Sequence, residues 1–174
     1  LSADGRTVAY SSGVRDLVSD DANGVDDVFI YDRQTGVRTL VSRHSSGEQG
    51  NAESYDPAIS ADGRYVTFQS HASNLVAGDG NGAPDVFLHD RQTGATTLVS
   101  RGGSGAPLPG SSFEPALTAG GEQVVFWYDA ALVPGDVNGH YDVFLYDRPW
   151  ASIRLVSGLI LPGPYRFYTP GVMR

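Results

Sequence analysis

A chain of 174 residues with 40% hydrophobic residues is long enough for one domain with a buried core. Its formal net charge is −8 and it has no basic stretch, which argues against nucleic acid or an anionic membrane surface as a partner. It has no cysteine, which excludes disulfides, thiolate metal sites and cysteine nucleophiles. No apolar run approaches the ~18 residues of a membrane span, and no signal peptide is visible.

The first feature along the chain is a turn that returns at a fixed spacing. A Ser-Ala-Asp-Gly turn begins at Ser2 and again 58 residues later at Ser60, and a Thr-Ala-Gly-Gly version begins a further 58 residues on, at Thr118. Such a period is the signature of a repeat architecture. The chain starts inside the first repeat, so we expect it to be a processed product or part of a longer protein. The three predicted repeats span about residues 1–54, 55–112 and 113–157.

Each repeat is predicted to form four antiparallel strands. In the second repeat, residues 56–60 form a short first strand before an Asp-Gly turn. The second strand alternates, with Val66 and Phe68 on one face. The third strand, residues 86–89, is apolar on both faces, as in a strand buried on both sides. Residues 97–100 form the fourth strand, and in the first repeat only the end of the first strand is present.

A turn motif, Asp-Arg-Gln-Thr-Gly, connects the third and fourth strands at residues 32–36 and 90–94. Its Asp is expected to accept backbone hydrogen bonds and its Gly to supply a positive φ. Its Arg is expected to bridge to a carboxylate of the next repeat. In the third repeat the turn reads Asp-Arg-Pro-Trp at residues 147–150, which makes Trp150 an apolar surface or an edge plug.

Four-stranded units of this kind cannot bury both faces alone, but they can when stacked side by side. This is the principle of a β-propeller, whose blades are four-stranded sheets around a central channel. We therefore predict an all-β fold of three propeller blades over residues 1–157, a partial or half propeller. Residues 158–174 do not continue the repeat, and both an edge strand and a tail without fixed structure remain open for them.

Two motifs carry a resemblance to a known family. The Ser-Ala-Asp-Gly-Arg-Tyr turn at residues 60–65 and the Asp-x-Asn-Gly-x-x-Asp-Val-Phe loops, as at residues 79–87, resemble the repeats of TolB-like bacterial propellers and, more closely, related secreted bacterial repeats. The resemblance covers residues 1 to about 157. It implies a propeller that is usually a binding scaffold, in the periplasm or outside the cell, and it names no ligand.

Propellers of this type usually have six or more blades, whereas this chain contains three. Either two identical chains complete a six-bladed ring, as a homodimer, or the remaining blades belong to a longer protein. An exposed blade face and strand edge would otherwise promote association.

The acidic loop before each third strand is the best candidate for chemistry. It presents side-chain oxygens at its first, third and seventh positions, and a glycine after the Asn allows a sharp turn. Calcium is bound by six to eight oxygens from carboxylates, amides and carbonyls, so the loop predicts a weak calcium site completed by water and backbone groups. The candidate metal ligands are Asp21, Asn23, Asp27, Asp79, Asn81, Asp85, Asp136, Asn138 and Asp142.

The same loop also has a purely structural interpretation. Asp and Asn form Asx turns and tolerate left-handed backbone conformations, and Asn-Gly is a strong turn pair. Either function would repeat with the blades, so the sequence leaves both open.

No catalytic pattern is visible. The nucleophile-elbow, zinc-protease and phosphate-loop motifs are absent, and none of the four histidines shares a repeat position with another. His89 stands where Tyr31 and Tyr146 stand in the other repeats, which indicates a half-buried strand residue. We therefore expect no active site and no catalytic residue in this chain.

Trp127 and Tyr128 break the repeat, because the earlier repeats have polar residues at these positions. Such a break marks either a functional site or packing against the non-repeating segment after residue 157.

The leading hypothesis is a non-catalytic binding or scaffold module that presents one face to a protein or a glycan. A second hypothesis is the propeller domain of a larger hydrolase, peptidase or lyase. A third is a half propeller that self-associates.

Overall fold

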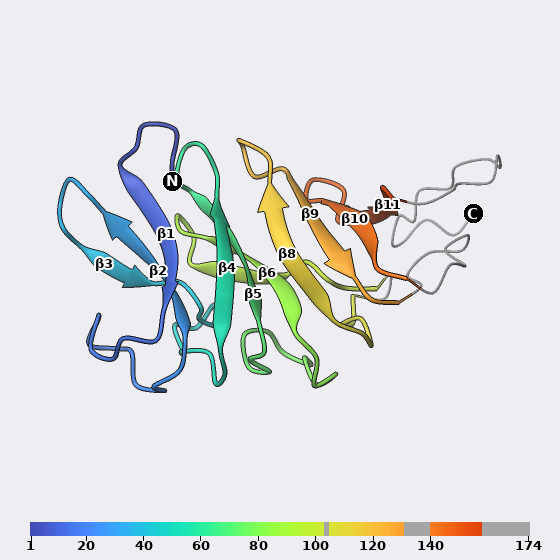
Figure 1. Ribbon diagram of the computed structural model, residues 1–174, viewed down its shortest axis with the longest axis horizontal. Helices are drawn as coiled ribbons and strands as arrows, with labels where there is room; N and C mark the ends of the chain where they lie inside the picture. Colours follow the sequence, from blue (N-terminus) through green and yellow to red (C-terminus); the bar gives the residue numbers. More distant parts are fainter. Residues whose placement is uncertain (103–104, 131–139, 158–174) are drawn as a thin grey trace.

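The computed structural model describes residues 1–102, 105–130 and 140–157. These residues form eleven β-strands in three antiparallel sheets that stand side by side (Figure 1). No helix long and apolar enough to cross a membrane occurs in these ranges. The predicted all-β fold of stacked propeller blades is thereby confirmed. The strand predicted as one possibility within residues 158–174 lies outside the described residues.

Each sheet corresponds to one repeat. Blade 1 consists of β1 (Thr7–Ser12), β2 (Asp27–Asp32) and β3 (Arg38–Leu40), in that order across the sheet. Blade 2 consists of β4 (Ser54–Ile59), β5 (Tyr65–Ser70), β6 (Asp85–Asp90) and β7 (Ala95–Leu98). Blade 3 consists of β8 (Ser112–Leu117), β9 (Gln123–Tyr128), β10 (Asp142–Asp147) and β11 (Ser152–Leu155).

The fourth strand of each blade lies earlier than predicted. In blade 2 it covers Ala95–Leu98 rather than residues 97–100. The reason is Ser100, whose hydroxyl accepts the N–H of Val86 at 2.9 Å and donates to Asp85 at 2.6 Å. Regular pairing of β7 with β6 therefore ends before Ser100, and the Ser100 side chain binds the start of β6 instead. Ser42 makes the same two contacts in blade 1.

Two hydrophobic cores hold the three blades together, one at each boundary. The core between blades 1 and 2 contains Val28, Ile30, Val41, Val66, Phe68, Ala72, Leu75, Phe87 and Leu98. The core between blades 2 and 3 contains Tyr65, Val86, Leu88, Val99, Leu108, Val124, Phe126, Tyr128, Phe144 and Tyr146. Because blade 2 contributes to both cores, β5 is buried along its whole length. In β9, buried residues alternate with more exposed ones, as predicted for the second strand of a blade.

The repeated turns connect neighbouring blades through their backbones. Ala3 N–H donates to the carbonyl of Ala61 at 2.8 Å, and Ala61 N–H donates to the carbonyl of Ala119 at 2.7 Å. These bonds connect equivalent turns of neighbouring blades. They therefore fix how the first strand of one blade lies relative to the first strand of the next.

The Asp-Arg-Gln-Thr-Gly turn has the predicted form but not the predicted arginine contact. Asp32 accepts the backbone N–H of Gln34 at 2.9 Å, and Gly36 has φ of 74°. The prediction that the arginine bridges to the next blade is wrong, because Arg33 donates to the carbonyl of Gly5 within its own blade at 2.7 Å. Gly5 belongs to the Asp-Gly turn, which lies beside this motif. The arginine therefore connects two turns of the same blade.

Candidate functional site

The acidic loop of blade 1 is closed by side-chain hydrogen bonds of Asn23 and of Gln49, which lies outside the loop. Asn23 Oδ1 accepts a backbone N–H two residues on at 3.0 Å, and its Nδ2 donates to the carbonyl of Gly50 at 2.9 Å. Gln49 Nε2 donates to Asp21 at 3.0 Å and to Asp27 at 2.8 Å. An amide group therefore bridges the two carboxylates that were predicted as calcium ligands.

The acidic loop of blade 2 lacks this amide, because Pro107 occupies the equivalent position. Asn81 Nδ2 instead donates to Asp85 and to the carbonyl of Leu108, both at 2.7 Å. Burial raises the pKa of Asp85 to about 6, and the nearby charge of Asp79 acts in the same direction. Burial also raises the pKa of Asp79. Blade 2 thus holds a pair of poorly solvated carboxylates.

In blade 3 only part of the predicted metal set is described. Asp136 and Asn138 lie outside the described residues, and Asp142 accepts a hydrogen bond from Ser157 at 2.8 Å. No cluster of three or more His, Cys, Asp or Glu side chains suited to a metal ion occurs in the part of the chain that the structure describes. The side chains of Asn23 and Asn81 accept the backbone hydrogen bonds expected of structural Asx turns. Calcium binding stays a prediction.

His89 has the environment of a strand residue. It is buried, its Nδ1 lies 2.9 Å from the hydroxyl of Thr96, and burial lowers its pKa to about 4. The ring is therefore neutral at physiological pH and its contact is with a hydroxyl group.

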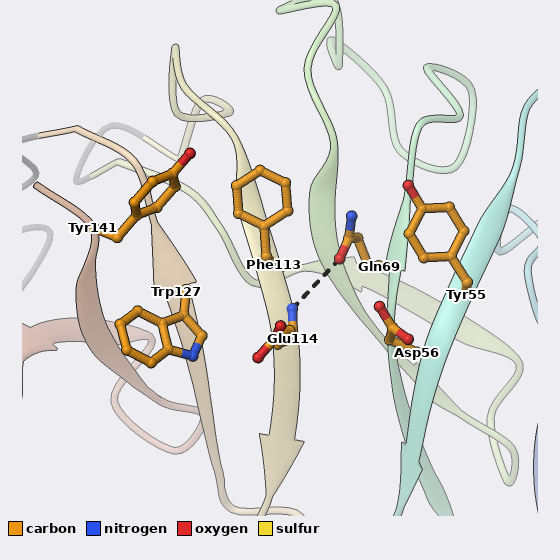
Figure 2. Close-up of a pocket in the computed structure, with 7 residues that line it drawn as sticks. All are labelled: Tyr55, Asp56, Gln69, Phe113, Glu114, Trp127 and Tyr141. Carbon is orange, nitrogen blue, oxygen red and sulfur yellow. Dashed lines mark hydrogen bonds between the residues drawn. The ribbon is translucent and has the colours of Figure 1, made fainter.

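A groove of about 630 Å³ lies between blades 2 and 3. Figure 2 shows Phe113, Trp127 and Tyr141 on the blade 3 side and Tyr55 and Asp56 on β4 opposite, with Gln69 and Glu114 between them. Of these seven lining residues, only Trp127 stands out in the sequence, because it breaks the repeat. The available signal was an acid-proline pair, preceded by an aromatic residue, at the same position of two repeats.

The two groove carboxylates lie on strained backbone. Asp56 has φ of 52° and Glu114 has φ of 48°, and each precedes a proline. The register of each strand shifts at this point, by a bulge within β4 and within β8. A left-handed conformation in a residue other than glycine costs about 1–3 kcal/mol, and such strain concentrates at functional sites. Bulges also redirect side chains, here the two carboxylates.

Gln69 fixes the floor of the groove. The residue is only 3% exposed, and its side-chain Oε1 accepts the backbone N–H of Glu114 at 3.4 Å (Figure 2). This bond joins β5 of blade 2 to the bulge of β8. Blade 2 therefore contacts the backbone that carries the blade 3 carboxylate.

The two aromatic residues that break the repeat have different environments. Tyr128 is buried at the blade boundary, 6.0 Å from the ring of Phe144, and its hydroxyl accepts the N–H of Gly110 at 3.1 Å. Trp127 lies on the opposite face of the same strand and is 40% exposed in the groove. The packing interpretation thus holds for Tyr128, whereas Trp127 belongs to the groove.

A second break in the repeat lies in the same groove. Tyr141 replaces Pro84 of the previous repeat, just as Trp127 replaces Gln69. Tyr141 is 60% exposed and packs edge to face against Phe113, with ring centroids 6.1 Å apart. Both substitutions add aromatic surface to this groove, so the boundary between blades 2 and 3 differs from that between blades 1 and 2.

The electrostatic character of the groove is acidic. Its described lining includes two carboxylates and no cation, and the three salt bridges of the described residues involve other carboxylates. Burial raises the pKa of Tyr55, and the charges of Glu53 and Asp56 add to that increase. The phenol of Tyr55 is therefore protonated at neutral pH, and it lies 2.6 Å from His71 Nε2.

Three stacked antiparallel sheets with this connectivity have the architecture of β-propeller blades. The structure is similar to TolB from Acinetobacter baumannii, with a TM-score of 0.54 and 18% identity over 91% of this chain and 31% of that one. A protein described as TolB from Agrobacterium tumefaciens gives a TM-score of 0.54 and 19% identity over 88% of this chain and 46% of that one. The tricorn protease gives a TM-score of 0.53 and 13% identity over 89% of this chain and 17% of that one.

These similarities establish the fold. The chain spans between about a third and a half of the length of the two TolB structures. No protein-family model matches the sequence, and no curated protein matches it significantly.

Proposed function

We propose that this chain is a non-catalytic binding module of an exported bacterial protein, and that the groove between blades 2 and 3 receives its ligand, a protein or a glycan. The observation that supports this proposal is the coincidence of features at one place. Two strained carboxylates and the two exposed aromatic substitutions of blade 3 all line the same groove. Export to the periplasm or the cell exterior rests on the resemblance to TolB-like repeats.

The proposal is tested with a reporter inside the groove. The chain has two tryptophans, and Trp150 is 73% exposed in a turn outside the groove. Trp150→Phe therefore leaves Trp127 as the single fluorophore. We expect members of a peptide library or a glycan array to change its emission, and we expect Tyr141→Ala, made in the same background, to weaken binding. Binding that is equal in the Tyr141→Ala chain would place the ligand elsewhere.

A second candidate is the propeller domain of a larger hydrolase, peptidase or lyase. The fold is also similar to a prolyl endopeptidase, with a TM-score of 0.51 and 16% identity over 92% of this chain and 21% of that one. The domain composition of the full-length gene tests this candidate, because a catalytic domain next to the blades would support it.

A third candidate is self-association of two chains into a six-bladed ring. Its support is blade 1, in which β1 is an edge strand of a three-stranded sheet within the described residues. Unpaired strand edges promote association. Light scattering should then give twice the chain mass of 18.5 kDa. A monomer across the whole concentration range would exclude the ring.

A further inference from the structure

We propose that the occupant of the groove is a peptide segment of a partner protein that carries an arginine side chain, an inference that rests on the proposed function of the groove. It goes beyond that function because it names the chemistry that is recognised.

The charge of the groove favours a cationic ligand. Asp56 and Glu114 are both exposed in the groove, and no basic side chain is present in its described lining. The three salt bridges of the described residues use Asp20, Asp32 and Asp90, which leaves the two groove carboxylates outside all of them. A net charge of −8 further attracts a basic partner at long range. The groove is therefore complementary to a cation.

The aromatic surface of the groove favours arginine over lysine. Trp127 and Tyr141 are 40% and 60% exposed, and Phe113 packs against Tyr141. Aromatic faces attract cations, and they bind arginine in particular because a planar guanidinium group stacks on them. Lysine is a compact, strongly hydrated charge without this planar face.

The chain already holds its own arginines against aromatic rings and carboxylates. The guanidinium of Arg64 lies 4.7 Å from the ring centroid of Tyr65 and donates to both oxygens of Asp90, at 2.9 and 2.7 Å. Arg148 lies over the same ring at 4.2 Å. The groove presents the same pair of groups, aromatic faces beside carboxylates, without an arginine from the chain itself.

A glycan fits this lining less well. Sugar hydroxyls need donors and acceptors in the site, but two neutral polar groups of the lining already have hydrogen-bond partners. Gln69 accepts the N–H of Glu114, and the hydroxyl of Tyr55 contacts His71. The carboxylates, which are the strongest acceptors, favour a charged donor over a neutral one because charge-assisted hydrogen bonds are stronger.

The experiment compares two capped hexapeptide libraries with identical mixed flanking residues. One has arginine at a fixed central position, and the other has citrulline, which keeps the shape and removes the charge. Binding is read from Trp127 emission in the Trp150→Phe chain and from backbone amide shifts by NMR. We expect the arginine library to bind about tenfold more tightly than the citrulline library. The double variant Asp56→Asn/Glu114→Gln should abolish that difference.

A matched control keeps the same change in net charge. Asp16 and Glu48 are exposed carboxylates that do not line the groove, so Asp16→Asn/Glu48→Gln should preserve the arginine preference. Equal binding of the two libraries, or a preference that survives in Asp56→Asn/Glu114→Gln, would overturn the inference. A glycan from the array that binds instead, and is lost in Tyr141→Ala, would leave the proposed function standing and refute the arginine ligand. Absence of binding by peptides and glycans alike would refute both.

Discussion

Asp56 and Glu114 occupy the same position in successive blades, and both have a left-handed backbone, with φ of 52° and 48°, directly before a proline. A residue before proline is biased toward extended conformations, and the left-handed region is unfavourable for any residue with a Cβ. The same strain in two blades places two carboxylates along the boundary where the aromatic residues of blade 3 lie.

This strain predicts that glycine is tolerated better than alanine at position 114. Glu114→Gly should raise the free energy of unfolding by about 0.5–1 kcal/mol relative to Glu114→Ala, because glycine tolerates positive φ but loses more backbone entropy on folding. Both variants lack the carboxylate, so their difference isolates the backbone effect. Urea unfolding measures it, and an alanine variant as stable as the glycine variant would show that the backbone is not strained.

A buried hydroxyl gives a second prediction. Ser54 Oγ donates to Ser70 Oγ at 2.8 Å, but the equivalent Ser112 Oγ is buried with no hydrogen-bond partner within the described residues. The reason is that Tyr128 takes the place of Ser70 in blade 3. Ser112→Ala should therefore stabilise the chain by about 1 kcal/mol, and Ser54→Ala should destabilise it by a similar amount. Thermal melts distinguish them, and two shifts of the same sign would contradict this assignment.

Most of the fold could be predicted from the sequence, because each blade repeats the same turns and strand patterns. The two Ser-Ala-Asp-Gly turns at Ser2 and Ser60 fixed the period, and apolar segments such as residues 86–89 marked the buried strands. The end of the fourth strand could not be predicted, because it depends on the hydroxyl contacts of Ser100 with β6.

The groove could be predicted only in part. Trp127 was identified because it breaks the repeat. Asp56 and Glu114 read as ordinary strand residues, since a bulge with positive φ leaves no pattern beyond an acid before a proline. The contact between Gln69 and Glu114 joins two blades, and no local sequence signal indicates it.

The burial of Asp85 predicts an unusual dependence of stability on pH. Its pKa is about 6 in the folded chain against an ordinary value of 3.8. The folded state therefore binds more protons than the unfolded state between these values, so stability is highest below pH 4 for this group and falls as pH rises through about 6. The loss is up to about 3 kcal/mol. The raised pKa values of Asp27 and Asp79 act in the same direction.

Urea unfolding at a series of pH values from 4 to 8 measures this loss. The decrease should be smaller in Asp85→Asn, because that variant carries no ionisable group at the site. Asp16→Asn, an exposed change in the loop between β1 and β2, serves as the control and should leave the profile unchanged. Identical slopes for Asp85→Asn and the natural chain would mean that burial of Asp85 does not determine the profile.

Calcium binding predicts a difference between blades 1 and 2. In blade 1 the amide of Gln49 already donates to Asp21 and Asp27, whereas Pro107 replaces that amide in blade 2 and leaves Asp79 and Asp85 as a buried pair. Millimolar calcium at pH 7.5 should therefore raise the melting temperature, with Asp79→Asn reducing the shift and Asp21→Asn preserving it.

A ligand that binds only the folded state stabilises it by about 2.7 kcal/mol at a hundredfold excess over Kd, so even weak binding is measurable. Magnesium provides the ionic control, because it requires near-ideal octahedral geometry and dehydrates reluctantly. Melting curves that are the same with calcium, with magnesium and with chelator would leave the acidic loops as Asx turns alone. In that case the carboxylate of Asp85 would serve only to accept the hydrogen bonds of Asn81 and Ser100 at the start of β6.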